Sequence, residues 1–157
     1  MGNTAYSSAT RTAYMSNVAS KTTNEIFTQN LKHDIHESMS PKKLGIREAC
    51  DSDVHPNTVP IIIALDVTGS MGRIPENIIR NDLTHLMEKL IHGGLPDVAI
   101  MFLAIGDLFY DSHPLQVGQF ESGDQELAMW LERTYIEGCG GGDAEESYGL
   151  AWIVAGK

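Results

Sequence analysis

The chain has 157 residues, with 11 basic and 21 acidic side chains and a formal net charge of −10. This length suits one domain with a tail, and a hydrophobic content of 42% argues against wholesale disorder. The acidic excess argues against a nucleic-acid-binding surface, and the apolar runs, such as residues 61–65, are too short to cross a membrane. The charge instead fits a protein that gathers carboxylates around a cation.

Residues 1–23 are rich in serine and threonine and contain no acidic residue, which predicts a flexible arm. They lack the apolar stretch of a secretory signal, so we expect a cytoplasmic protein. Residues 24–57 are interpreted as an N-terminal extension. Within it, residues 24–40 favour a short helix that is capped by Asn24 and ended by Pro41, and the polar remainder predicts a connector.

An α/β pattern begins at residues 60–65, a continuous β-branched run typical of a central parallel strand buried on both faces. A helix is predicted from Pro75 to about Leu90, because its apolar residues recur on one face. Residues 98–105 form a second apolar run, which predicts a second fully buried strand. Strand, helix and strand at this spacing predict a right-handed βαβ unit with parallel strands.

The remaining elements are shorter. Residues 115–120 predict an antiparallel edge strand, in which Gln116 and Gln119 suit an exposed position. A capping-box-like sequence from Ser122 predicts the next helix, and a last helix is expected to begin near Ala144. We expect both tryptophans to lie in the core.

The loop after the first strand carries three oxygen side chains at alternate positions, Asp66, Thr68 and Ser70. In open α/β sheets the ligand site lies beyond the carboxyl ends of the parallel strands. Carboxylate and hydroxyl oxygens suit Mg²⁺, Mn²⁺ or Ca²⁺ better than zinc. The alternative is that one of these side chains merely caps the following helix.

The segment IIIALDVTGSMG resembles the metal-ion-dependent adhesion site of von Willebrand factor A (VWA) domains, in which Asp-x-Ser-x-Ser follows an apolar strand. Thr68 replaces the first serine and keeps the hydroxyl. The resemblance covers about residues 58–157 and implies a Rossmann-like three-layer sandwich with a mostly parallel sheet and one antiparallel edge strand. It also implies that Asp66, Thr68 and Ser70 are metal ligands.

The second metal loop of VWA domains presents a threonine, and Asp143 occupies that place here after three glycines. The resemblance implies that Asp143 is a fourth ligand, whose added charge weakens the capture of an acidic residue from a partner. Alternatively, Asp143 caps the following helix together with Glu146. Asp107 either accepts a hydrogen bond from metal-bound water or is a solvated turn residue, and Asp111 is expected on the surface.

The third metal loop of the family follows a further strand that this chain does not reach. The resemblance therefore implies an incomplete VWA-like domain, and we expect either a fragment or natural truncation, or a missing half that is supplied from elsewhere. Without the missing part, the strand at residues 60–65 would be an uncovered apolar edge, which is a template for pairing with another chain.

These features lead to a non-enzymatic module in which a divalent cation mediates contact with a protein partner, through an acidic residue of that partner. The resemblance adds an AAA+ ATPase as a candidate partner, and self-association is a further one. One alternative is a phosphatase of the haloacid dehalogenase type with Asp66 as nucleophile, although Thr68 at its acid/base position cannot transfer protons near neutral pH. Another is a structural assembly subunit with an incidental metal.

Overall fold

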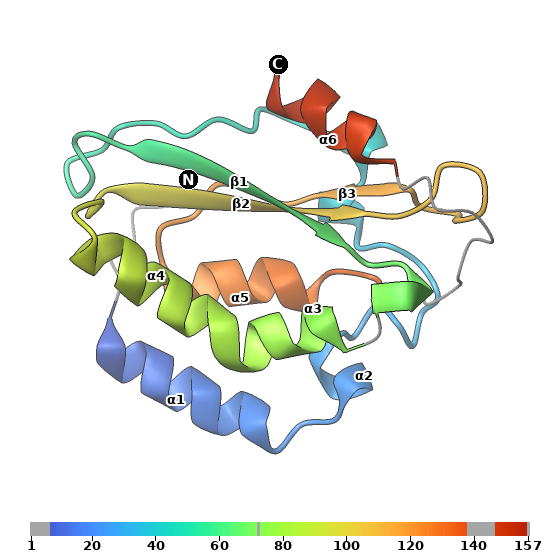
Figure 1. The fold of residues 1–157 in the computed structure, drawn as a ribbon, viewed down its shortest axis with the longest axis horizontal. Coiled ribbons are helices and arrows are strands. Elements are labelled where there is room, and N and C mark those ends of the chain that lie inside the picture. The colour runs from blue at the N-terminus through green and yellow to red at the C-terminus, as the bar shows by residue number, and fades with distance from the viewer. Residues whose placement is uncertain (1–6, 72, 138–146, 157) are drawn as a thin grey trace.

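The computed structural model describes residues 7–71, 73–137 and 147–156 and shows an α/β fold. A three-stranded sheet has the order β1 (Val59–Asp66), β2 (Val98–Ile105) and β3 (Leu115–Val117). β1 and β2 are parallel, and β3 is antiparallel to β2. Helix α6 (Tyr148–Ala155) covers one face of the sheet, and helices α1 to α5 lie on the opposite face (Figure 1). The predicted parallel pair and its antiparallel neighbour are confirmed.

β1 and β2 are paired along their whole length, from Val59 opposite Val98 to Asp66 opposite Ile105. Both strands therefore end at the same edge of the sheet. Every residue of β2 is buried, whereas β1 is mostly half-buried or exposed. In the part of the chain that the structure describes, β1 has only β2 as a neighbour. It is an edge strand there, as expected without a further strand, and the prediction that it is buried on both faces is wrong for these residues.

The crossover between the parallel strands is helical over almost its full length, as predicted. It consists of α3 (Ile74–Asn77), a π-helical segment (Ile78–Asp82) and α4 (Leu83–His92). Pro75 lies in the first turn of α3. Proline is tolerated at this position because a backbone N–H there would have no acceptor within the helix. The π-helical turn was not predicted, since the apolar spacing on one face does not reveal an inserted residue.

The apolar side chains form one core on each face of the sheet. On the helical face, Ile61, Ile63 and Leu65 of β1 pack with Phe102 of β2 and with α1, α4 and α5. On the other face, Ile62 packs near Ala151 of α6. This division follows from the strand, in which successive side chains point to opposite faces.

Helix α1 (Ser8–Ala19) occupies the segment predicted to be a flexible arm, and this difference is a correction to the prediction. Its residues show little amphipathic pattern, so tertiary contacts stabilise it. Val18 is 1% exposed, Arg11 forms an ion pair with Glu88 at 2.7 Å, and the Tyr14 hydroxyl donates to the Glu132 carboxylate at 2.9 Å. Burial raises the pKa of the Tyr14 hydroxyl above its usual range.

The N-terminal extension contains less helix than predicted. Helix α2 (Thr23–Ile26) has only one turn and begins after Thr22, which forms a capping box with Glu25 in place of the expected cap Asn24. Two short 3₁₀ helices follow, at Glu37–Met39 and Pro41–Lys43, so Pro41 begins an element and does not end one. Residues 44–58 contain no helix or strand, in agreement with the predicted connector.

From β3 to the end of the chain, the structure differs from the prediction in three places. Helix α5 (Asp124–Glu132) is preceded by Gly123 as its cap residue, and Ser122 does not cap it. Trp130 is buried as expected, but Trp152 on α6 is 79% exposed, so the prediction that it lies in the core is wrong. Gln116 was predicted on an exposed edge and is 1% exposed, because other segments cover β3.

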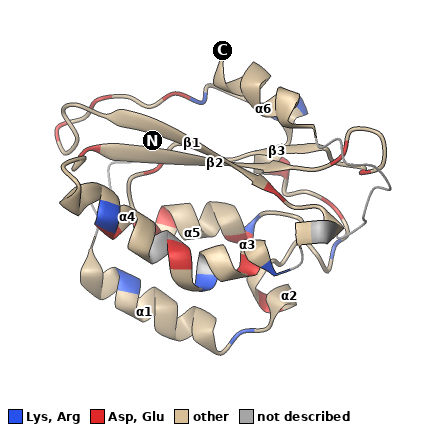
Figure 2. Ribbon diagram, in the orientation of Figure 1, with Lys and Arg blue, Asp and Glu red and all other residues tan. Residues whose placement is uncertain are grey.

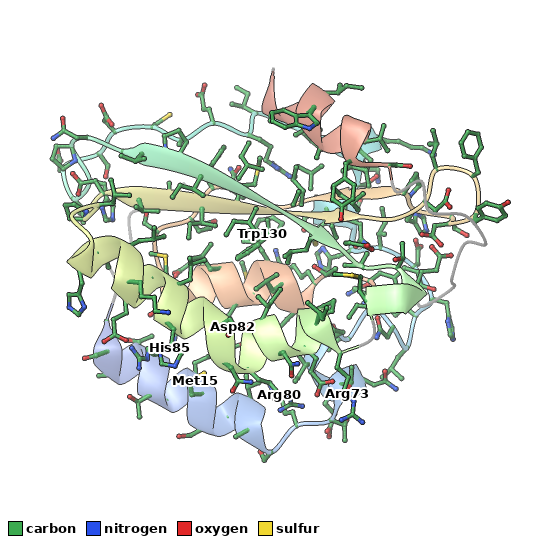
Figure 3. All side chains as sticks on the ribbon, viewed as in Figure 1. Met15, Arg73, Arg80, Asp82, His85 and Trp130 are labelled. Carbon is green, nitrogen blue, oxygen red and sulfur yellow. The ribbon has the colours of Figure 1, made fainter. Side chains whose placement is uncertain are left out.

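Arg80 in the π-helical segment joins α1 to the crossover helix (Figure 3). Its guanidinium donates to the carbonyl oxygens of Val18 and Lys21 and to the Glu76 carboxylate. We expect Arg80→Ala to lower the free energy of unfolding by about 3 kcal/mol, because hydrogen bonds to a charged group are lost together. Urea unfolding followed by circular dichroism measures this loss.

The matched control is Arg73→Ala, since Arg73 is exposed and precedes the same crossover helix. This variant is expected to stay within about 0.5 kcal/mol of the unmodified protein. If the two variants lose the same free energy of unfolding, Arg80 contributes only its charge, and its hydrogen bonds to Val18, Lys21 and Glu76 add little.

Candidate functional site

The carboxyl ends of β1 and β2 bring two acidic segments to one edge of the sheet. Asp66 is the last residue of β1, and Asp107 follows the end of β2 after one glycine. Acidic positions mark the end of β1 and the loop after β2 (Figure 2). The register of the strands thus juxtaposes residues that are 41 positions apart in the chain (107 − 66).

Asp66 and Thr68 form a tight local pair. The Asp66 Oδ1 atom accepts hydrogen bonds from the Thr68 backbone N–H at 2.8 Å and from the Thr68 hydroxyl at 2.7 Å. Both residues are buried, with exposed fractions of 7% and 3%. The loop is held further by the Val67 N–H, which donates to the Ile105 carbonyl, and it continues into a 3₁₀ turn at Gly69–Met71.

Asp107 is held in a second local turn. Its Oδ1 atom accepts a hydrogen bond from the Phe109 N–H at 2.7 Å, and its own N–H donates to Asp111 Oδ2 at 2.7 Å. Asp107 is 2% exposed. The alternative of a solvated turn residue is therefore wrong for Asp107, and its role toward a metal-bound water stays a prediction.

Asp111 was predicted to be a surface residue, yet it lies with Asp66 and Asp107 at the carboxyl ends of β1 and β2, which together form the acidic edge of the sheet. Burial raises the pKa of its carboxyl group, and the negative charges of Glu137, Asp107 and Asp66 raise it further. A hydrogen bond from the Asp107 backbone opposes this rise. Asp111 Oδ1 is buried without a hydrogen-bond partner in the described part of the chain. In the sequence, the spacing of four positions between Asp107 and Asp111 could have indicated the hydrogen bond between them.

The four predicted ligands are described unequally. Asp66 and Thr68 are brought together. The backbone of Ser70 lies in the 3₁₀ turn next to them, but its side chain and the whole of Asp143 lie outside the described residues. Within the described ranges, no three histidine, cysteine, aspartate or glutamate side chains form a group that could hold a metal ion.

The chemistry of Asp66 and Thr68 nevertheless fits a hard cation. The Thr68 hydroxyl donates a hydrogen bond to Asp66 Oδ1, so the lone pairs of the hydroxyl oxygen are turned away from the carboxylate. A carboxylate and a hydroxyl oxygen are ligands that Mg²⁺, Mn²⁺ and Ca²⁺ accept. The neighbouring acids Asp107 and Asp111 add negative charge that favours a cation at this edge.

An exposed apolar loop adjoins the acidic edge. Leu108, Phe109 and Tyr110 directly follow Asp107 and are 52%, 82% and 59% exposed. The Leu108 N–H donates to the Ser147 hydroxyl, which connects the loop to the start of α6. Exposed apolar side chains next to a polar site are typical of surfaces that bind other proteins.

Searches of protein-family models, curated proteins and solved structures find no match to this chain. In the ranges that the structure covers, there is no helix of the length and apolar character needed to span a membrane.

Proposed function

We propose that this chain is a non-enzymatic, divalent-metal-dependent module that binds another protein, in the manner of a VWA domain with its Rossmann-like architecture. The observation that carries this proposal is the buried Asp66–Thr68 pair at the carboxyl end of a parallel strand. The chain's own residues Asp66, Thr68, Ser70 and Asp143 would hold Mg²⁺, with Mn²⁺ and Ca²⁺ as the other candidate ions.

A bound cation would supply a positive centre for an acidic side chain of the partner. Asp66 and Thr68 orient one another before any ligand arrives, because the Thr68 N–H and hydroxyl both donate to Asp66 Oδ1. The exposed side chains of Phe109 and Tyr110 would add apolar contact beside this centre. An AAA+ ATPase in the cytoplasm remains a candidate partner, and the acidic surface disfavours nucleic acid.

The phosphatase alternative receives less support. It needs Asp66 as a nucleophile and a carboxylic acid two residues later, where Thr68 stands. The Thr68 hydroxyl donates to Asp66 Oδ1 and cannot serve as an acid near neutral pH. A binding role uses the same hydrogen bond to orient both side chains.

Asp66→Asn tests the metal site. The asparagine oxygen can still accept both hydrogen bonds from Thr68, so the variant is expected to fold. A Mg²⁺ ion that binds only the folded protein, at a concentration 100 times its Kd, raises the free energy of unfolding by about 2.7 kcal/mol. The loss of the carboxylate charge is expected to abolish this stabilisation. Thermal melting with and without Mg²⁺ measures the difference.

The matched control is Asp53→Asn, which removes an exposed carboxylate from the connector. Its melting temperature should rise with Mg²⁺ as much as that of the unmodified protein. If Asp66→Asn and the unmodified protein show the same Mg²⁺ response, the proposed site is rejected.

A further inference from the structure

Four basic side chains gather where the N-terminal extension meets the end of α5. Arg47 and Arg133 both contact the indole ring of Trp130, with guanidinium carbons 5.8 Å and 5.0 Å from the ring centroid. Trp130 lies on α5, on the helical face of the sheet (Figure 3). Burial lowers the pKa of His36, and the positive charges of Arg133 and Lys32 lower it further, so these two side chains lie near the His36 ring. These four residues are named the basic cluster: Lys32, His36, Arg47 and Arg133.

The two arginines of the basic cluster have more donors than the described residues satisfy. Within those residues, the Arg133 guanidinium has only its contact with the Trp130 ring. Arg47 donates one hydrogen bond, from Nη2 to the Ser38 carbonyl at 2.9 Å, and its Nε atom is buried without a partner in the same ranges. A guanidinium carries five N–H donors, and an aromatic ring does not replace oxygen acceptors. Both side chains therefore keep N–H groups for an acceptor from outside the chain.

His36 adds a donor to the basic cluster. Its Nδ1 atom accepts a hydrogen bond from the Ser38 N–H at 3.2 Å and lies 2.7 Å from the Ser38 hydroxyl oxygen. A ring nitrogen that accepts a hydrogen bond carries no proton, so the proton of the neutral ring is on Nε2. The local turn thus fixes the tautomer in which Nε2–H is the donor that remains for an anion.

The carboxylates of the same segments are bonded to other groups. They and their partners are Glu37 with Lys43, Asp34 with His113, Glu121 with Trp130 Nε1, and Glu132 with the Tyr14 hydroxyl. The basic cluster is therefore a local concentration of positive charge in a chain whose net charge is −10. Such a cluster attracts a single anionic group, whereas the charge of the remaining chain disfavours a long polyanion such as nucleic acid.

The basic cluster lies on the β3 side of the sheet. The 3₁₀ helix at Glu37–Met39 contacts β3, and the Gln116 side chain of β3 bonds to Tyr135, two residues after Arg133. In the described sheet, β2 lies between β3 and β1. A further strand beside β1 would therefore be added at the opposite edge of the sheet, away from the basic cluster.

We propose that the basic cluster binds a phosphate group. The guanidinium groups of Arg47 and Arg133 match the oxygens of a tetrahedral dianion, and the Lys32 ammonium adds charge. A carboxylate has two oxygens and one negative charge, so it satisfies fewer of these donors. This site is separate from the acidic edge and needs no metal, so its failure would leave the proposed function unchanged.

Titration of the full chain with inorganic phosphate, followed by nuclear magnetic resonance, tests the proposal. Chloride keeps the ionic strength constant, because salt screens exposed charges, and divalent cations are left out. We expect saturable shifts of the His36 ring and of the Arg133 Nε–H signal, and binding of acetate about tenfold weaker than that of phosphate. The absence of saturable shifts in the basic cluster, or equal affinity for the two anions, would overturn the proposal.

A phosphoserine-containing tripeptide distinguishes the source of the phosphate group. Binding about tenfold tighter than that of inorganic phosphate would identify a phosphorylated protein as the source. Equal affinity would identify free phosphate or a small ester, and both results support the site. Binding of neither probe would contradict it.

Substitutions in the basic cluster test which side chains bind phosphate. Arg133→Gln removes one guanidinium and should raise the Kd for phosphate about tenfold. Lys32→Gln changes an exposed side chain, so this variant should fold, and it should raise the Kd about threefold. The matched control Arg73→Gln removes an exposed arginine outside the basic cluster and should leave the Kd unchanged. If folded Arg133→Gln and Lys32→Gln variants bind phosphate as tightly as the unmodified protein, the proposal is rejected, and Lys32→Gln decides alone if Arg133→Gln does not fold.

Discussion

Gln116→Leu is expected to lower the free energy of unfolding by about 3 kcal/mol, because a buried main-chain pair loses its partner. The Gln116 side-chain amide donates to the Tyr135 carbonyl at 2.8 Å and accepts from the Tyr135 N–H at 2.9 Å. The Gln116 side chain thus replaces a neighbouring strand as the hydrogen-bond partner of the Tyr135 backbone, in the segment after α5. Leucine has a similar size, so the loss reflects the hydrogen bonds more than a cavity. For a chain of this size the melting temperature should fall by about 6–12 °C.

Gln119→Leu is the matched control. Gln119 follows β3 in the same segment, and its Oε1 atom is buried without a hydrogen-bond partner among the described residues. Its replacement removes no bond shown by the structure and is expected to change stability by less than about 1 kcal/mol. If the two variants lose the same stability, the Gln116 hydrogen bonds contribute little.

Asp124→Asn is expected to make the protein more stable above neutral pH. Asp124 at the first turn of α5 is 4% exposed, and both of its carboxylate oxygens lack a hydrogen-bond partner within the described ranges. Burial, against the opposing positive charge of Arg11 and with a smaller contribution from the charge of Glu126, raises the pKa of this carboxyl group to about 6. Ionisation of Asp124 therefore destabilises the folded state.

The direction of the pH dependence follows from proton binding. Between its unfolded value near 3.8 and its folded value of about 6, the folded protein holds more protons than the unfolded one. The free energy of unfolding therefore falls as pH rises through this range, by about 3 kcal/mol in total for this group. Asparagine cannot ionise, so the variant should lose this fall and exceed the unmodified protein by about 2 kcal/mol near pH 8.

Chemical unfolding at a series of pH values from about 4 to 8 checks this expectation across the whole linkage range. Asp53→Asn, an exposed carboxylate in the connector, should keep the unmodified pH profile. A parallel profile for Asp124→Asn and the unmodified protein would mean that Asp124 does not titrate differently in the folded state.

The parallel strands and the helix between them were predictable because their patterns are strong and local. Residues 60–65 and 98–105 are continuous apolar runs, and the structure has strands at Val59–Asp66 and Val98–Ile105. The helix between them shows a regular apolar face. Burial on both faces was predicted for both strands but holds only for β2, because the number of neighbouring strands is not encoded in the run itself.

Helix α1 and the exposed Trp152 show the limit of such patterns. Nothing in residues 8–19 resembles an amphipathic helix, yet Val18, Arg11 and Tyr14 each find a distant partner in α4, α5 or the core. A tryptophan on an apolar helix was expected inside, but Ala151 is the α6 residue buried in the core, and the neighbouring Trp152 is exposed. Both outcomes depend on contacts between distant parts of the chain.

The candidate site divides in the same way. Asp66 and Thr68 are two residues apart, so their hydrogen bond is local and the motif revealed it. The proximity of Asp107 and Asp111 to Asp66 depends on the parallel register, which sets the two strand ends side by side. The ligand roles of Ser70 and Asp143 stay predictions, since the Ser70 side chain and Asp143 lie outside the described residues.

Local sequence was enough to predict the two parallel strands, the helix between them and the Asp66–Thr68 loop, because each pattern depends on residues close together in the chain. Only packing between distant segments places Gln116 in a buried position against Tyr135, and encloses Asp124 without a hydrogen-bond partner among the described residues. The physical reason is that burial and pairing are properties of the packed chain. The type of a residue limits the contacts that it can make, but the packing of distant segments determines which residues become its neighbours.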